Sequence, residues 1–147
     1  MARLTVIVGL AGSGKSHLTN EIAAEKGIPA FHDFLARNLI PYVTLSEGFC
    51  SLLIALHAGK DCVANEVCLV HADKWAAFIK LMDMIFEKTV TINPIFFENT
   101  PAQCVANVDA DNVKPNKKGR LEGIAYYTQA YSIPDGAETR PVYVPAP

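Results

Sequence analysis

The sequence predicts an α/β fold of three layers, with a parallel sheet between helices. Two observations support this class. Apolar runs of strand length alternate along the chain with longer segments whose apolar residues recur at helical spacing. A strand, a helix and a further strand in succession form a right-handed crossover, which makes neighbouring strands parallel and covers both faces of the sheet. With 147 residues the chain has the size of one domain, and we expect a single domain over 1–147.

The first two predicted strands flank a helix. Residues 4–8 form an apolar run that is typical of a buried parallel strand. Apolar residues then recur at helical spacing up to Gly27, and glycine commonly ends helices. A short second strand is expected at 28–32, and the pattern of the segment after it is ambiguous.

Two more helices are expected on either side of the next strand. The spacing of Thr44 and Glu47 matches a capping box, and apolar residues at i, i+3, i+4 and i+7 predict a helix from about 45 to 58. The strand lies within 60–70. Asp73 can cap the following helix, which ends near Lys88. The predicted buried face of that helix consists of Trp75, Phe78, Ile79, Met82 and Ile85.

The last part of the chain continues the alternation. Residues 90–97 form a strand, in which Pro94 favours the start or an edge. Thr100 and Pro101 open a helix that has proline at its first position. A polar segment over 109–120 is followed by a helix at 121–131, a turn at 134–136 and a last strand at 142–144.

The segment from Gly9 to Ser16 matches the pattern G-x-x-x-x-G-K-[ST] at every fixed position, between the first strand and the first helix. Its glycines let successive N–H groups, backed by a helix N-terminus, point at one polyphosphate. Lys15 adds a cation, and the Ser16 hydroxyl can ligate Mg²⁺. We therefore expect ATP and Mg²⁺ as ligands, and a glycine-rich turn without a ligand is the alternative. The predicted nucleotide-binding residues are Gly9, Ala11, Gly12, Ser13, Gly14, Lys15, Ser16 and His17.

Composition excludes several other classes of protein. Half of the residues are hydrophobic and 19% are charged, which argues against disorder, and the apolar stretches are too broken to span a bilayer. We expect no membrane partner and no signal peptide, a cytoplasmic location (the host cytoplasm if the protein is phage-encoded), and a monomer or small homo-oligomer. The net charge of −2 argues against a broad nucleic-acid surface and leaves a local one open.

Cysteine and histidine do not form a recognisable ligand set. Cys50, Cys62, Cys68 and Cys104 contain no C-x-x-C pair and lie among apolar neighbours, and the four histidines are equally scattered. This pattern suits reduced core thiols better than disulfides or a transition-metal site.

Polar residues follow several of the predicted strands. The glycine loop, Asp33, the pair Asn65 and Glu66, and the pair 98–99 all come at the carboxyl end of a strand. Because ligands of open parallel sheets bind at that edge, we expect these residues to converge on one cleft.

At this point the chain resembles the small P-loop kinases, which include nucleoside monophosphate kinases, shikimate and gluconate kinases and phage polynucleotide kinases. The resemblance spans nearly the whole chain and rests on the loop from Gly9 to Ser16, on Asp33, and on the basic segment from Lys114 to Arg120. It implies a three-layer P-loop NTPase fold of small-kinase type with a short lid. The runs 97–101 and 131–134 look most like phage-type and polynucleotide-kinase-like members.

Asp33 is the predicted general base. Phosphoryl transfer to an alcohol needs a carboxylate within reach of the hydroxyl, and the strand end beside the P-loop lies opposite the γ-phosphate. Phage polynucleotide kinases have an Asp at the corresponding place with an Arg three residues on. Here Arg37 is four residues on, and it is the candidate for positioning the acceptor. The alternative role for Asp33 is a turn or a helix cap.

Glu66 ends the strand where P-loop proteins usually have an Asp that orients Mg²⁺. We expect Glu66 to contribute to the magnesium site together with Ser16. The alternative is that Asn65 and Glu66 are ordinary polar residues of a strand end.

Basic residues near the end of the chain form the predicted lid. Arg120 is one of only four arginines and is expected to stabilise the transferring charge. Lys114, Lys117 and Lys118 lie beside it in a glycine-containing segment that is suited to close over substrate phosphates. A lysine-rich surface turn is the alternative.

These patterns predict an ATP- and Mg²⁺-dependent phosphotransferase whose acceptor is a hydroxyl of a nucleotide or nucleic acid. Within the resemblance, small phage enzymes that phosphorylate hydroxymethyluracil in DNA are the sharper candidate. A small-metabolite kinase, which the near-neutral net charge favours, and a non-catalytic or regulatory NTP-binding protein are the alternatives.

Overall fold

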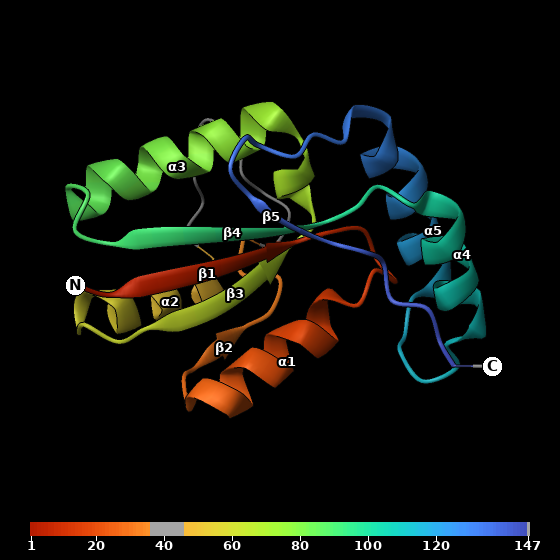
Figure 1. Cartoon of the computed structure of the whole chain (residues 1–147), viewed down its shortest axis with the longest axis horizontal. Coiled ribbons are helices and arrows are strands. Elements are labelled where there is room, and N and C mark those ends of the chain that lie inside the picture. The colour runs from red at the N-terminus through yellow and green to blue at the C-terminus, as the bar shows by residue number, and fades with distance from the viewer. Residues whose placement is uncertain (36–45, 147) are drawn as a thin grey trace.

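The computed structural model describes residues 1–35 and 46–146, and its centre is one all-parallel sheet (Figure 1). The sheet has five strands in the order β2-β3-β1-β4-β5. The strands are β1 (Arg3–Val8), β2 (Ala30–Phe31), β3 (Cys62–Glu66), β4 (Thr91–Phe97) and β5 (Glu138–Arg140). The central strand β1 pairs with β4 over Arg3–Val8 and with β3 from Leu4 to Val8, so the P-loop that follows it leaves from the middle of the sheet.

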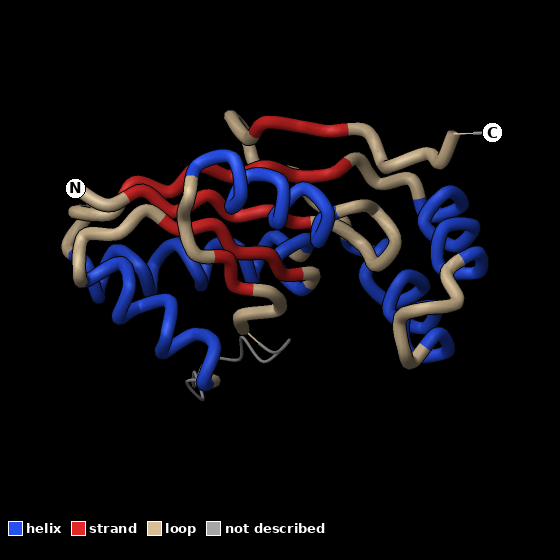
Figure 2. The backbone as a smooth tube through the Cα atoms, turned by 90° about the horizontal axis from the view of Figure 1, so that it is seen from below, coloured by secondary structure: helices blue, strands red, loops and turns tan. Residues whose placement is uncertain are grey.

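Helices cover both faces of the sheet, as the sequence predicts. On one face lies α1 (Lys15–Lys26), and on the other lie α2 (Glu47–His57) and α3 (Ala72–Phe86) (Figures 1 and 2). Beyond the carboxyl ends of the strands stand α4 (Pro101–Ala110) and α5 (Lys117–Tyr127), which pack on each other. Two single turns of 3₁₀ helix, Cys68–Val70 and Thr128–Ala130, complete the described elements. This confirms the three-layer α/β fold.

The side chains of β1 point alternately to the two faces of the sheet, and both helical layers pack on them. Leu4, Val6 and Val8 are buried against the side chains of α2 and α3, whereas Ile7 is buried against Leu18 of α1. Successive side chains of a strand point to opposite faces, so a strand that is apolar at nearly every position binds a helical layer on each side. None of the described helices has the length and apolar character needed to cross a bilayer.

Most predicted elements are confirmed, and the ends of several differ. Pro101 is the first residue of α4, and Gly27 ends α1 in the left-handed conformation. For α2 the N-cap is Ser46, whose Oγ accepts from the Phe49 N–H; Thr44 lies outside the described residues. At Pro94, β4 pairs with β1 on one side only, because the pairing of β4 with β5 starts at Ile95.

The prediction for α3 is wrong in two details. Its N-cap is His71, and Asp73 lies in the first helical turn instead of capping it. On its buried face Phe86 replaces Ile85, because Phe78, Met82 and Phe86 recur every four residues while Ile85 is 42% exposed.

The last strand and the last helix are also misplaced in the sequence prediction. The strand is Glu138–Arg140, whose residues are all exposed and give no apolar signal, whereas Val142 leaves the sheet and is buried beside α4 and α5. The helix begins at Lys117 and not at 121. Asn116 has a left-handed φ of 59° and its side chain accepts from the Gly119 N–H, so it starts the helix within the polar segment.

All four cysteines are free thiols, and three of them are buried. Burial raises the pKa of the Cys62 and Cys104 thiols to about 11, so both remain protonated at neutral pH. Cys62, Cys68 and Cys104 thus lie in the core as predicted, whereas Cys50 is only half-buried.

Candidate active site

The P-loop passes tightly between β1 and α4. Gly12 has a φ of +79°, and a Cβ at this position would lie 2.5 Å from the carbonyl oxygen of Cys104. A Cβ at Gly9 would lie 2.6 Å from Ser13 Oγ. Only glycine fits both places, and the loop is therefore built for close approach of backbone rather than being an ordinary turn.

The N-terminus of α1 has no side-chain cap. Its N-cap is Gly14, with a φ of 103°, and this residue supplies no side-chain cap hydrogen bond. The N–H groups of this turn carry the positive end of the helix dipole and need acceptors, which phosphate oxygens supply. The loop thus fits the polyphosphate of a nucleotide.

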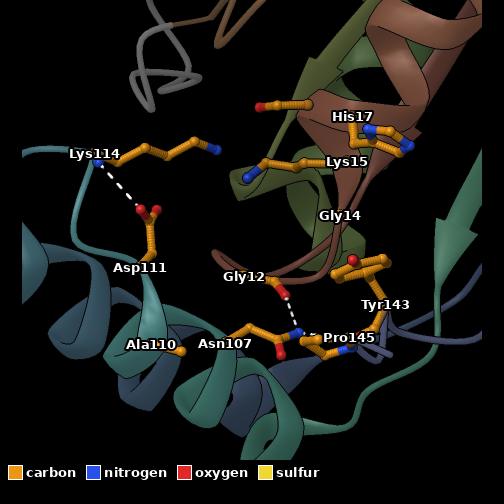
Figure 3. A pocket seen from close by; sticks show the side chains of 11 residues that line it. Gly12, Gly14, Lys15, His17, Asn107, Ala110, Asp111, Lys114, Tyr143 and Pro145 are labelled. Carbon is orange, nitrogen blue, oxygen red and sulfur yellow. Dashed lines mark hydrogen bonds between the residues drawn. The ribbon is translucent and has the colours of Figure 1, made fainter. Parts of the chain in front are cut away.

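A pocket of about 300 Å³ opens in front of the loop (Figure 3). Three segments far apart in the sequence form its walls. Lys15 and Lys114 point toward each other from opposite sides of this pocket, and the ring of Tyr143 stands beside the loop. The lining residues are Gly12, Gly14, Lys15, Ser16, His17, Asn107, Ala110, Asp111, Lys114, Tyr143 and Pro145. Two cations, a helix N-terminus and an aromatic ring form a surface that suits a nucleoside triphosphate.

Arg120 holds the connection between α4 and α5 in place. Its Nη1 lies 3.1 Å from Asp111 Oδ2, and its Nη2 and Nε donate to the carbonyl oxygens of Lys114 (2.8 Å) and Pro115 (3.2 Å). Hydrogen bonds from the Val113 and Lys114 N–H groups, followed by Arg120, lower the pKa of Asp111. With Ala11, Lys15 and Tyr127, Arg120 also lines a narrow cavity of about 10 Å³. Arg120 therefore orders the predicted lid and borders the P-loop.

The lysines of the predicted lid separate into two groups. Lys114 lines the pocket in front of the P-loop. Lys117 donates from Nζ to the Asp109 carbonyl oxygen at 2.9 Å, and Lys118 is exposed and lies 3.9 Å from Glu122. Because Lys117 and Lys118 belong to the first turn of α5, they are not part of a lid loop and do not line that pocket.

On the other side of the P-loop, Asn65 links three elements at the carboxyl ends of the strands. Its Nδ2 donates to Thr19 Oγ1 on α1 at 2.9 Å and to His32 Nδ1 at 2.8 Å. Its Oδ1 accepts from the Asp33 N–H at 3.1 Å. Asn65 thus positions the turn after β2 that carries Asp33.

Glu66 is fully buried beside this turn. One carboxylate oxygen accepts from the Leu35 N–H at 3.1 Å and the other from the Val67 N–H at 2.8 Å. Burial raises the pKa of Glu66, the nearby charge of Asp33 raises it further, and the backbone N–H groups and Lys15 oppose the change. Asp33 and Lys15 are therefore both close enough to Glu66 for their charges to act on its carboxyl.

Asp33 is exposed and has a left-handed φ of 47°, a conformation that Asp tolerates better than most residues. Its place at the carboxyl end of β2, next to Glu66, is the predicted one. Arg37 lies outside the described residues. Of the pair 98–99, Asn99 bonds Thr128 and is absent from the residues that line the pocket in front of the loop.

Of the two predicted Mg²⁺ ligands, Ser16 lines the pocket in front of the P-loop and Glu66 does not. The described residues contain no group of three or more His, Cys, Asp or Glu side chains that could hold a metal ion. A magnesium ion here would depend on Ser16 and on the oxygens of the nucleotide, which fits the way Mg²⁺ usually binds with few protein ligands. Both oxygens of Glu66 already accept backbone hydrogen bonds.

Sequence reasoning missed Asn107 and Tyr143. The Nδ2 of Asn107 donates to the carbonyl oxygens of Gly12 (2.8 Å) and Tyr143 (2.7 Å), and the Tyr143 N–H donates to the Ser13 carbonyl oxygen at 3.0 Å. A polar residue next to the buried face of α4, between Cys104 and Val108, was the only signal in the sequence.

No protein-family model matches the sequence. The chain is 34% identical over 142 residues to the uncharacterized protein R277 of Acanthamoeba polyphaga mimivirus, a match that covers 89% of this chain and 87% of that protein.

Solved structures with a similar fold include several kinases. A gluconokinase from Sinorhizobium meliloti 1021 has a TM-score of 0.58 and 15% identity, over 96% of this chain and 83% of the gluconokinase. A fungal RNA kinase has a TM-score of 0.58 and 15% identity, over 90% of this chain and 68% of that chain. The APS kinase CysC of Mycobacterium tuberculosis, solved with AMPPNP and APS, has a TM-score of 0.55 and 18% identity, over 95% of this chain and 88% of that chain. At these identities the likeness is one of fold, and the fold is that of small P-loop kinases.

Proposed function

We propose that this chain, which belongs to one family with the mimivirus protein R277, is an ATP-dependent phosphotransferase that acts on a hydroxyl of a nucleotide or nucleic acid. One observation carries the proposal. Lys15 lines the pocket in front of the P-loop, and its charge opposes the rise in the pKa of the buried Glu66 at the end of β3. The P-loop begins beside this carboxyl, because Val8, the last residue of β1, pairs with Glu66.

The residues support a reaction of phosphoryl transfer. Asp33 accepts the proton of the acceptor hydroxyl, whose oxygen forms a bond to the γ-phosphorus as the bond to the β,γ-bridging oxygen breaks. Lys15 and the N–H groups at the start of α1 stabilise the charge on the phosphate oxygens. Lys114 closes the other side of the pocket. A bound Mg²⁺, held through Ser16, would neutralise further charge on the β and γ oxygens.

A small-metabolite kinase is the second candidate. The net charge of −2 favours a small acceptor over a long polyanion. A nucleotide, a nucleic-acid end and the hydroxymethyluracil base of DNA all offer hydroxyls within the first proposal. We also propose that the protein acts in the cytoplasm.

The acceptor is identified by following labelled phosphate. The protein is incubated with γ-labelled ATP, Mg²⁺ and separate pools of DNA, hydroxymethyluracil-containing DNA, RNA ends, nucleotides and sugars. Label in one pool, absent with the Lys15→Ala variant, would identify the acceptor class. Binding of ATP without label in any pool and without ATP hydrolysis would contradict catalysis and favour a non-catalytic nucleotide-binding protein.

Salt dependence separates a nucleic-acid acceptor from a small one. If a DNA strand binds, each neutralised phosphate releases counterions, and the logarithm of affinity falls with the logarithm of salt with a slope of about −0.7 to −0.9 per contact. A sugar or mononucleotide acceptor gives a shallow dependence. A flat response of the acceptor KM between low and physiological salt would favour the metabolite kinase.

A further inference from the structure

We infer that Asn107 is a positioning residue for the nucleotide: it fixes the curvature of the P-loop and the aromatic wall of the pocket through one amide group. This inference rests on the proposed binding of ATP. Asn107 lies on α4, and its Nδ2 donates to the Gly12 carbonyl oxygen at 2.8 Å and to the Tyr143 carbonyl oxygen at 2.7 Å (Figure 3). A single side chain thus joins α4, the P-loop and the segment after β5.

The orientation of this amide is determined by its surroundings. Two carbonyl oxygens need donors, so the NH₂ group must face them, and the opposite atom, Oδ1, accepts from Gln103 Nε2 at 2.9 Å. A reversed amide would place its oxygen against two other oxygens. Gln103 is one helical turn before Asn107 and therefore supports the side chain from its own helix.

Two hydrogen bonds act on consecutive peptide groups of the P-loop. Asn107 donates one to the Gly12 carbonyl oxygen, and the Tyr143 N–H donates the other to the Ser13 carbonyl oxygen. In a trans peptide the C=O and the following N–H point in opposite directions. When Asn107 holds the Gly12 carbonyl outward, the Ser13 N–H points inward, where it donates to the Leu10 carbonyl oxygen at 3.1 Å. When the Tyr143 N–H holds the Ser13 carbonyl outward, the Gly14 N–H is directed to the opposite side. Asn107 reaches this second peptide through Tyr143.

The same contact fixes one wall of the pocket. Tyr143 is 54% exposed, and its ring lines the pocket beside Gly14 and His17. The segment that carries it is irregular, so its position depends on the burial of Val142 beside α4 and α5 and on the hydrogen bonds of its backbone to Asn107 and Ser13. Loss of the Asn107 amide therefore affects the polyphosphate end of the pocket and its aromatic wall together.

Two ligands separate these effects. Inorganic tripolyphosphate probes the loop, and ATP with Mg²⁺ probes the loop and the wall. We expect Asn107→Leu, which keeps the size and removes both hydrogen bonds, to weaken tripolyphosphate and ATP by about tenfold each in titration calorimetry. Tyr143→Ala should weaken ATP and leave tripolyphosphate within about twofold. Asn107→Gln, which keeps the amide, should recover part of the affinity.

Asn99→Leu is the matched control. Asn99 bonds Thr128 and ties the start of α4 to the end of α5 without contact to the P-loop, so this variant should lower thermal stability and leave both affinities unchanged. Equal affinities of wild type and a folded Asn107→Leu for tripolyphosphate would overturn the inference. Wild-type protein that binds neither ligand would instead overturn the proposed function on which it rests.

Discussion

The two sides of Lys15 are built in different ways. On the side of β4 and β5, a pocket of about 300 Å³ is bounded by backbone groups, a helix N-terminus and the Tyr143 ring. On the side of β3 and β2, Asn65 connects the side chains of Thr19 and His32, and the buried Glu66 accepts two backbone hydrogen bonds. The described cavity beside Arg120 is only about 10 Å³. The first side accommodates a ligand that many proteins share, whereas the second is shaped by side chains particular to this chain. Under the proposed function, specificity for the acceptor would depend on the second side.

Lys15→Ala tests the residue that both sides share, and we expect the largest effect. Lys15 brings full positive charge to the phosphate oxygens as the bond breaks, so its removal should reduce phosphate transfer by about 10³-fold or more. The measurement is single-turnover transfer from labelled ATP, with circular dichroism to verify folding. Near-normal turnover by a folded variant would remove the loop from the mechanism.

Asp33→Asn tests the acceptor side alone. The proposed base contacts the acceptor and not the nucleotide, so kcat should fall by about 10²-fold or more while the affinity for ATP stays within about twofold. Steady-state kinetics and ATP titration provide the two values. If the affinity for ATP collapses and the bound enzyme still turns over, Asp33 has a structural role in the turn after β2.

Tyr143→Ala tests the nucleotide side alone. The Tyr143 ring lines the pocket, and we propose that it stacks on the base of ATP. Its loss should then raise the KM for ATP by about tenfold with little change in kcat. Tyr143→Phe keeps the ring and serves as the control. A raised KM for the acceptor with an unchanged KM for ATP would reverse the assignment of the two sides.

Glu66→Gln tests the side of β3 and β2 through the free energy of unfolding, and here we expect the smallest effect. Burial raises the pKa of Glu66 above its ordinary value of 4.5, so between that value and the raised pKa the folded protein binds more protons than the unfolded chain. The contribution of this carboxyl to the free energy of unfolding is therefore present at low pH and is lost as pH rises through this range, by at most about 1.4 kcal/mol per pH unit. Urea denaturation at several pH values should show wild type losing stability relative to Glu66→Gln as pH rises from 4.5. The opposite trend would contradict the assignment.

How much the sequence could predict also differs between the two sides. The P-loop is a contiguous pattern of eight residues, and the strand and the helix that flank it are adjacent in the sequence. Its position and conformation therefore follow from local sequence. The contacts of Asn107 cannot be found in this way, because its partners lie 95 and 36 residues away. Asp33 and Glu66 were predicted to meet because parallel strands end at one edge, although the burial of Glu66 depends on packing that no motif encodes.

The wrong placement of Lys117 and Lys118 has a local cause. The polar segment after α4 contains Asn, Lys and Gly and has the composition of a loop, but Asn116 adopts a left-handed φ and caps a helix that starts at Lys117. The capping distance from Asn116 to Gly119 is present in the sequence, yet glycine at that position lowers the helical signal. Helix ends of this kind are decided by a single side-chain hydrogen bond.

The hydrogen bond from the Tyr143 N–H to the Ser13 carbonyl oxygen joins two points that are far apart along the chain. During synthesis, residues 9–16 leave the ribosome long before Tyr143 does, and until then one P-loop carbonyl lacks its partner. A contact of such large sequence separation forms late, because most of the chain must be ordered first. The affinity for a nucleotide should accordingly reach its full value only when segment 141–145 has docked, so an incomplete chain would hold ATP more weakly.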